Sequence, residues 1–337
     1  MIFNRQGDGP LLTRRDIPAM PPDIVDPSSV FNPGAVEKGG KTYLLLRVQT
    51  RGRRTYTVPA RGDGHEFKVA KRPVEFSELD DLKDPDTGMA LTIHHIYDAR
   101  ITPLEGGLVV VTAVDTDQGC RLAVWRAVGK PQARFAGLNQ LELIGINLNR
   151  DTRNGVLFPE KVDGRYLMLD RPNDRRSGGG PRSGRGIVLS ASDDLVAWED
   201  LGPVMTGRPH YWDELIGSGP PPVKTREGWL HIYHGVATHF LGANIYQAGA
   251  VLLDLEDPRL VLGRTRDNIL EPREPWEMTG QVPNVVFPGG LTIAETDDEG
   301  FAVASSELKL YYGAADTAVG LAVSTVAEVI AACDKGE

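Results

Sequence analysis

The stretch Gly228-Trp229-Leu230-His231-Ile232-Tyr233 decides the fold, because it is one instance of a phrase that occurs five times. Each instance has a glycine or acidic turn, an apolar run, a polar insert and a second apolar run. The first runs begin at Gly40, Gly107, Gly164, Gly228 and Glu307. The second runs lie at 55–58, 121–125, 186–190, 246–253 and 320–324.

Short apolar runs of this kind, rich in Val, Ile, Leu and Tyr and broken by Gly, Pro, Asn and Asp, are typical of β-strands. Successive instances start roughly 55 to 80 residues apart, which leaves room for a four-stranded blade with long loops. The sequence therefore predicts an all-β, five-bladed β-propeller. We expect one catalytic domain over residues 1–337, because no break in composition marks a boundary. A two-sheet sandwich is the alternative.

The ends of the chain and one internal segment differ from the repeats. Residues 1–30 contain Pro18, Pro21, Pro22 and Pro27, which favours an extended strap. A short terminal helix is expected at 325–332, with Ser324 as its N-cap. Residues 177–186 are rich in Gly, Ser and Arg, and they indicate a mobile loop within a blade rather than a phosphate cradle, because no helix follows them.

Composition bounds the class of protein. The chain has 337 residues, of which 41% are hydrophobic and 25% charged, as in soluble globular proteins. Its net charge of −9 argues against a nucleic-acid surface, which needs a basic face. No segment has the order of a signal peptide or the length of a membrane span. We expect a cytoplasmic protein without nucleic-acid or membrane partners. A homo-oligomer stays open.

The propeller prediction has a consequence for the position of a site. Inner strands of a propeller converge on a central channel, so polar residues from different blades can meet there. Each such residue alone could also be an ordinary solvated strand end. If the first run of each repeat is the inner strand, the candidates are the residues at the ends of these first runs: Arg47, Asp98, Arg171, His234 and Asp316.

One short phrase, Tyr97-Asp98-Ala99-Arg100, combines a carboxylate with an arginine two residues away. Residues two apart on a strand share a face, so Asp98 and Arg100 are expected to point the same way. They could pair a proton donor with a substrate clamp, or they could form an ordinary ion pair at a strand end.

The residue types favour sugar chemistry over metal chemistry. The histidines show no His-Glu-x-x-His spacing, and the cysteines, Cys120 and Cys333, form no Cys-x-x-Cys pair. Carboxylates, arginines and aromatics remain. Inverting cleavage of a glycoside needs one acid for the leaving oxygen and one nucleophile on the opposite face. A water nucleophile needs a carboxylate base, whereas a phosphate nucleophile needs cations to hold it.

Eight segments, in order along the chain, carry a family resemblance. They lie at 31–36, 97–100, 153–161, 169–172, 216–222, 228–236, 282–288 and 311–317. Through them the chain resembles glycoside hydrolase family 130, the β-mannoside phosphorylases and related β-mannosidases, which are five-bladed propellers.

The resemblance implies roles for particular residues. It implies that Asp98 is the proton donor and that a β-mannoside and phosphate yield α-mannose 1-phosphate and a shortened acceptor, with inversion. The implied phosphate ligands are Arg153, Arg171, His234 and Tyr246. Contacts to the mannosyl unit or phosphate are implied for Asn32, Arg47, Arg53 and Asp316. Inorganic phosphate is then a co-substrate, and no metal or organic cofactor is expected.

Two other functions stay open at this point. The position before Ile216-Gly217, which is basic in many phosphorylases of the family, is Leu215. A β-mannosidase that uses water, with Glu214 or Glu277 as base, is therefore the first alternative. A noncatalytic sugar-binding propeller is the second. The linkage and the acceptor depend on loops such as 72–90 and 177–185.

Overall fold

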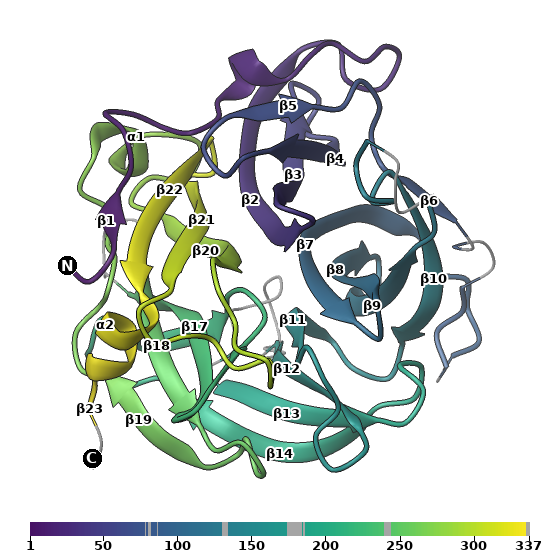
Figure 1. The fold of residues 1–337 in the computed structure, drawn as a ribbon. Helices are drawn as coiled ribbons and strands as arrows, with labels where there is room; N and C mark the ends of the chain where they lie inside the picture. The colour runs from purple at the N-terminus through teal and green to yellow at the C-terminus, as the bar shows by residue number, and fades with distance from the viewer. Residues whose placement is uncertain are drawn as a thin grey trace.

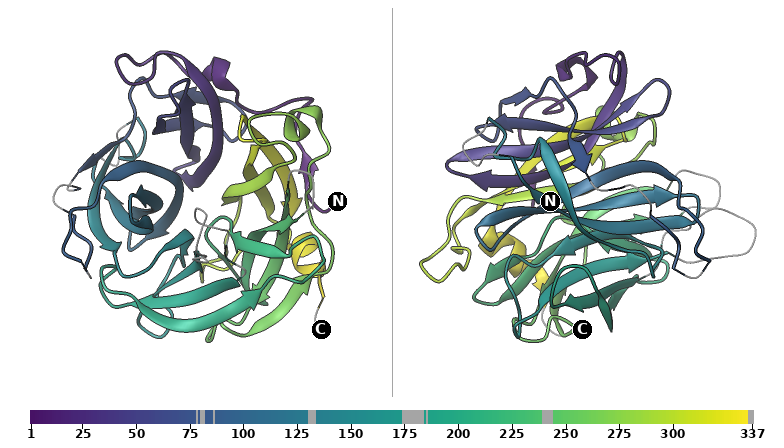
Figure 2. Two further views of the ribbon diagram at one scale, coloured as in Figure 1. Left: turned by 180° about the vertical axis from the view of Figure 1, so that it is seen from behind. Right: turned by 90° about the vertical axis from the view of Figure 1, so that its right-hand side faces the viewer.

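Five β-sheets surround a common axis in the computed structural model, which describes residues 1–77, 79, 82–85, 87–129, 134–173, 184, 186–238 and 244–334 (Figure 1). Figure 2 shows the same arrangement from behind and from the side. The predicted five-bladed propeller is confirmed, and the two-sheet sandwich is wrong. The loop expected at 177–186 lies outside the described residues, apart from Gly184 and Gly186.

The strands of each blade are given from the axis outward. The first blade has β2 (Pro27–Lys38), β3 (Lys41–Thr50), β4 (Thr55–Gly62) and β5 (Phe67–Val69). The second has β7 (Ile93–Leu104), β8 (Gly107–Thr116), β9 (Gly119–Ala127), β10 (Gln140–Asn147) and β6 (Glu75–Ser77). The third has β11 (Thr152–Leu157), β12 (Tyr166–Pro172), β13 (Gly186–Ser192) and β14 (Glu199–Thr206).

The last two blades contain the chain termini. The fourth has β15 (Leu215–Ser218) and β16 (Val223–Thr225), then β17 (Gly228–Ala237), β18 (Ile245–Leu253), β19 (Val261–Thr265) and the terminal β23 (Cys333–Asp334). The fifth has β20 (Val286–Ile293), β21 (Glu307–Ala314), β22 (Ala318–Thr325) and the N-terminal β1 (Asn4–Arg5). Because β1 pairs with β22, the start of the chain completes a blade that the end of the chain builds.

The repeated phrase forms the same hairpin in every blade. Its two apolar runs are the second and third strands, which pair in antiparallel fashion as β3–β4, β8–β9, β12–β13, β17–β18 and β21–β22. The innermost strand is contributed by the segment before each repeat, so the expectation that the first run lies innermost is wrong. Asp98 accordingly lies on the innermost strand β7, rather than at the end of a first run.

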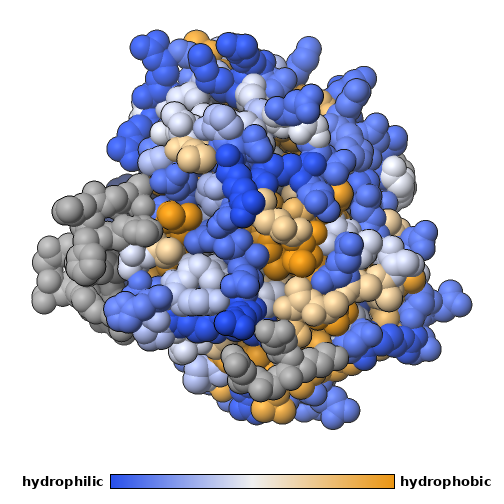
Figure 3. Space-filling model, turned by 90° about the vertical axis from the view of Figure 1, so that its left-hand side faces the viewer, coloured by the Kyte–Doolittle hydropathy of each residue, from blue (hydrophilic) through white to orange (hydrophobic). Residues whose placement is uncertain are grey.

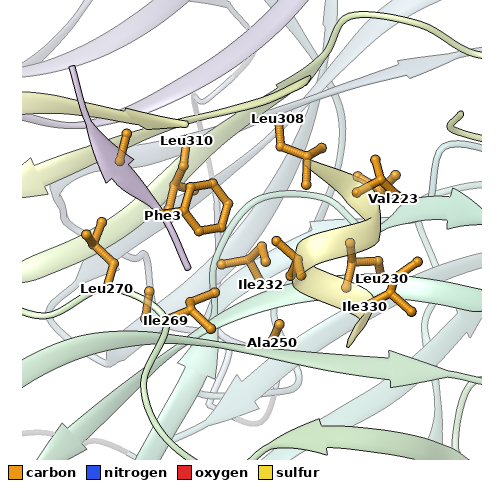
Figure 4. Close-up of a cluster of buried hydrophobic side chains, with 14 of the residues drawn as sticks. Phe3, Val223, Leu230, Ile232, Ala250, Ile269, Leu270, Leu308, Leu310 and Ile330 are labelled. Atoms are coloured by element: carbon orange, nitrogen blue, oxygen red, sulfur yellow. The ribbon is translucent and has the colours of Figure 1, made fainter. Parts of the chain in front are cut away.

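Apolar side chains fill the seams between neighbouring blades. Successive residues of a strand point to opposite faces, so Val109 and Val111 of β8 pack toward the third blade while Val110 packs toward the first. A sheet buried on both faces reads as a continuous apolar run, which explains why the repeats rarely alternate. Figure 4 shows the seam between the fourth and fifth blades, where Phe3, beside β1, lies among Ile269, Leu310 and their neighbours.

In the described ranges, three short helices accompany the strands: a 3-10 turn at Arg14–Asp16, α1 (Pro275–Met278) and α2 (Val326–Ala331). The predicted terminal helix is α2, but its N-cap is Thr325 and not Ser324, because the Thr325 hydroxyl accepts from the Glu328 amide. None of the helices formed by the described residues has the length and apolar character needed to traverse a lipid bilayer. Polar side chains cover most of the face that carries both termini, around a smaller apolar area (Figure 3).

A buried ion pair holds the N-terminal strand in place. Arg5 donates to both carboxylate oxygens of Glu277, at 2.8 and 2.6 Å, and the Tyr312 hydroxyl donates to Oε1 at 2.8 Å. The backbone amides of Arg273 and Glu274 donate to Oε2. Glu277 is fully buried, so its charge depends on these donors.

We predict that Arg5→Met destabilises the protein by about 3 kcal/mol, because it leaves a buried carboxylate without its cation. Urea unfolding with and without the substitution measures this difference. Arg259→Met is the matched control, because Arg259 pairs with Asp257 on the surface and its loss should leave the unfolding midpoint unchanged. Equal unfolding midpoints for Arg5→Met and Arg259→Met would contradict the role of the Arg5–Glu277 pair in holding β1 in the fifth blade.

Candidate active site

The inner strands of three successive blades share one irregularity. The pairing register shifts between Phe31 and Gly34, between Tyr97 and Arg100, and between Arg153 and Val156. Each shift leaves two residues unpaired, and the first of them is left-handed: Asn32 at φ 43°, Asp98 at φ 53° and Asn154 at φ 55°. Asn and Asp tolerate this conformation better than other residues with a Cβ.

Asp98 forms the first group of polar residues near the axis. Its Oδ1 accepts hydrogen bonds from Arg47 Nη1 and from Asn32 Nδ2, both at 3.0 Å. The Asp98 side chain keeps 12% of its surface exposed, so it is accessible as well as tightly held. Two residues from the first blade therefore fix one oxygen of a carboxylate from the second.

The alternation of a regular strand predicted that Arg100 points the same way as Asp98 and clamps a ligand beside it. The structure places the Arg100 side chain elsewhere. The bulge at Asp98 breaks that alternation. Arg100 is 1% exposed and donates to the carbonyl oxygens of Gly219 at 2.7 Å and Asp98 at 3.2 Å. Its guanidinium also lies 5.5 Å from the centre of the Phe287 ring. Burial lowers the pKa of Arg100, and the described residues give it no carboxylate in hydrogen-bond contact.

Asp316 joins the Asp98 group from the fifth blade. It follows β21 in a left-handed conformation at φ 49°. Burial raises the pKa of Asp316 to about 6, the charge of Arg47 acts against this rise, and the Asp98 carboxylate adds to it. Asn32, Arg47, Asp98 and Asp316 thus form one electrostatically coupled group.

Two arginines from the third blade form the centre of a second group. Arg153 and Arg171 are directly opposite each other in the pairing of β11 with β12. Arg171 is 5% exposed, and burial lowers its pKa to about 10, with Arg153 adding to the decrease. Arg153 Nη2 lies 3.4 Å from Asp115 Oδ1, at the edge of the group.

His234 completes the second group as a neutral imidazole. It is fully buried, and both burial and the charge of Arg171 hold its pKa well below the usual range. Its Nε2 lies 3.5 Å from Arg171 Nη1, and its ring lies near those of Tyr246 and Phe287, at centroid distances of 6.0 and 4.7 Å. A neutral histidine beside two guanidinium groups adds a hydrogen-bonding group without adding charge.

Several buried polar atoms of both groups lack a protein partner among the described residues. They are Asn32 Oδ1, Arg47 Nε, Arg153 Nε, Asn154 Oδ1, Arg171 Nε and His234 Nδ1. Buried polar groups are normally hydrogen-bonded, so unpaired ones indicate a place for a polar ligand. The nitrogens of the three arginines are donors, which suits a ligand rich in acceptor oxygens.

The structure brings most of the predicted site residues into these two groups, with four exceptions. Arg100 is buried against the carbonyl oxygen of Gly219, as described above. Arg53 is exposed in the turn between β3 and β4. Glu214 is half-buried and accepts a hydrogen bond from Thr238. Glu277 is fully buried against Arg5 and Tyr312, so its assignment as an alternative base is wrong.

Sequence reasoning missed two features of the site. Asn154 was part of a recognised segment, but its side chain lies at Gly217, where an added Cβ would be 2.8 Å from Asn154 Oδ1 and 2.5 Å from the His234 ring. The available signal was the polar residue followed by a small one or proline in Asn32-Pro33, Asp98-Ala99 and Asn154-Gly155. The second missed feature is the position of Tyr97, whose ring centre lies 4.3 Å from Arg47 Cζ and whose hydroxyl lies 4.0 Å from Cys120 Sγ.

Metal ligation is not supported by the described residues. Within that part of the chain, no three or more His, Cys, Asp or Glu side chains are grouped so that they could hold a metal ion.

The chain is similar to known proteins over most of its length. The sequence model of a family described as beta-1,4-mannooligosaccharide phosphorylase matches residues 13–335. A 1,2-beta-oligomannan phosphorylase from Thermoanaerobacter sp. (strain X514) is 31% identical over 313 residues, covering 90% of this chain and 92% of that protein. A beta-1,2-mannobiose phosphorylase from Listeria innocua is 36% identical over 311 residues, covering 91% and 74%.

A solved structure gives the same result in three dimensions. The complex of beta-1,2-mannobiose phosphorylase from Listeria innocua with beta-1,2-mannobiose superposes with a TM-score of 0.79 at 26% sequence identity. The alignment covers 98% of this chain and 99% of that one.

The coupling at Asp316 predicts a pH-dependent effect of Asp316→Asn on stability. Because the folded-state pKa of Asp316 is raised from 3.8 to about 6, its ionisation costs stability as pH rises through this window. The substitution should gain up to about 3 kcal/mol relative to wild type between pH 4 and pH 7. Urea unfolding of both proteins across this range measures the gain. A difference in unfolding free energy between the two proteins that does not change with pH would contradict the raised pKa of Asp316.

Proposed function

The chain belongs to glycoside hydrolase family 130, and from this premise we propose that it is an inverting phosphorylase of β-mannosides. The observation that carries the proposal is the pair Arg153 and Arg171 beside neutral His234, since the described residues give Arg171 no carboxylate. A site of this kind favours a small anion with several acceptor oxygens. Inorganic phosphate has that chemistry and acts here as co-substrate.

Phosphate acts as the nucleophile in this proposal. Arg153, Arg171, His234 and Tyr246 hold it so that one of its oxygens attacks the anomeric carbon of the mannosyl unit. An anionic nucleophile needs no carboxylate base, because it is already charged. Binding it in line with the bond to be broken supplies much of the catalysis, since reacting groups held in place lose little further entropy.

Asp98 acts as the general acid. It passes its proton to the glycosidic oxygen as the bond from that oxygen to the anomeric carbon breaks and the bond to phosphate forms. Hydrogen bonds from Arg47 and Asn32 to Oδ1 then stabilise the resulting carboxylate. The products are α-mannose 1-phosphate and the shortened acceptor.

Asn32, Arg47 and Asp316 are proposed to contact the mannosyl unit next to Asp98. They come from the first and fifth blades, while the acid comes from the second and the phosphate ligands from the third and fourth. We infer that the five blades work as a single catalytic domain. Arg53 stays a prediction, because its side chain is exposed in the turn between β3 and β4.

Hydrolysis is the less favoured reaction. A mannosidase of this geometry would need a carboxylate base opposite Asp98. Glu277 is fully engaged by Arg5, Tyr312 and two backbone amides, and Glu214 is bonded to Thr238. The matching family is described by a β-1,4 linkage and the two relatives are named for β-1,2 linkages, so the proposal covers β-mannosides as a class.

The direct experiment incubates the protein with β-1,2- and β-1,4-mannobiose, each with and without inorganic phosphate. We expect mannose 1-phosphate only when phosphate is present, and consumption of the disaccharide to increase with phosphate until it saturates. Free mannose released from both sugar units at a rate indifferent to phosphate would overturn phosphorolysis.

Asp98→Asn should lower kcat roughly 100- to 10,000-fold, because the amide cannot donate a carboxylic proton to the leaving oxygen. Steady-state assays of mannose 1-phosphate measure the loss. Asp257→Asn, on the surface, is the matched control and should match wild type. Near-normal turnover by a folded Asp98→Asn protein would reject Asp98 as the acid.

A further inference from the structure

Two aromatic rings enclose the arginine that holds the acid. The Cζ of Arg47 lies 4.7 Å from the centre of the Phe31 ring and 4.3 Å from the centre of the Tyr97 ring. Phe31 directly precedes Asn32, and Tyr97 directly precedes Asp98. The two bulges therefore place an aromatic ring and a polar side chain from each blade around one guanidinium.

The two aromatic rings restrict the guanidinium of Arg47 on the sides where it makes no hydrogen bond. Among the described residues, its guanidinium donates to Asp98, and its Nε is buried without a partner. A cation over an aromatic face is attracted by the ring quadrupole, and the attraction is stronger when both are desolvated. Tyr97 is 8% exposed, so its ring contributes under these conditions.

The hydroxyl end of Tyr97 faces the other group. It lies 4.0 Å from the sulfur of Cys120, which is fully buried. Cys120 lies opposite Asp115 in the pairing of β8 with β9, and Asp115 Oδ1 lies 3.4 Å from Arg153 Nη2. The same tyrosine thus touches the acid's arginine with its ring and, with its hydroxyl, the cysteine that lies across from the ion-pair partner of the phosphate arginine.

We propose that Tyr97 is a positioning residue that couples the proton donor to the phosphate site. Its ring fixes Arg47, and through Arg47 the carboxylate of Asp98. Its hydroxyl contacts Cys120 and, through Cys120 and the adjacent Asp115, fixes Arg153. One rigid side chain then sets the separation between the proton source and the nucleophile, which must act on the same bond from opposite sides. The role rests on the phosphorolysis proposed above.

The two ends of Tyr97 can be tested separately. Tyr97→Phe keeps the ring over Arg47 and removes only the hydroxyl beside Cys120. Phe31→Leu is the matched variant, because it removes the ring on the other side of Arg47 and leaves the hydroxyl in place. Tyr97→Leu removes both ends. Melting temperatures establish that each protein is folded before its kinetics are compared.

We expect Tyr97→Phe to raise the KM for phosphate roughly 3- to 10-fold, the effect of one lost hydrogen-bonding group, while kcat falls by about twofold or less. Phe31→Leu should lower kcat roughly 3- to 10-fold with little change in the KM for phosphate. Tyr97→Leu should show both effects. Isothermal calorimetry with inorganic phosphate should reproduce the order of phosphate affinities without turnover.

An unchanged KM for phosphate in Tyr97→Phe would overturn the coupling, and so would a Phe31→Leu protein that loses phosphate affinity as strongly as Tyr97→Phe. Failure of the proposed function gives a different result. In that case wild type itself would neither bind phosphate in the calorimeter nor form mannose 1-phosphate.

Discussion

Buried guanidinium groups to which the described part of the chain offers no carboxylate partner are the constraint on which this site depends. Arg171 lies opposite Arg153, and Arg100 is buried nearby with backbone carbonyls as its acceptors. Removing such charges from water is costly unless something of opposite charge completes the arrangement. Burial lowers the pKa of His234, and the charges of Arg171 and Arg100 lower it further, because a third cation there would increase the repulsion. An anionic co-substrate resolves the imbalance, and binding it is what the arrangement favours.

The propeller makes this arrangement possible through its bulged inner strands. In a regular strand, each of the side chains of Asn32, Asp98 and Asn154 would point to one face of its own sheet. The left-handed residue at each bulge turns these side chains out of the ladder instead. The apolar side chains between blades hold the strands beside the bulges in place, because each of these strands is buried on both faces. The same blades therefore stabilise the fold through their apolar seams and supply the polar side chains at the axis through their bulges.

The sequence predicted what depends on local pattern. The repeated phrase identified all five central hairpins, because a glycine turn between apolar runs is a short-range signal. Residues at strand ends, such as Arg171 and His234, could be placed near the axis for the same reason. The orientation of Arg100 could not, because one left-handed residue at Asp98 reverses the expected face. Nor could the burial of Glu277, which depends on Arg5 from the other end of the chain.

The central claim is that the acid and the phosphate site act on opposite faces of one anomeric carbon. The measurement that tests it most directly is the configuration of the first mannose 1-phosphate formed, read by proton and phosphorus NMR during the initial turnovers. Displacement from behind predicts the α-anomer from a β-mannoside. Formation of the β-anomer would contradict the account, because it would require attack from the same face or a covalent intermediate that this site does not provide for.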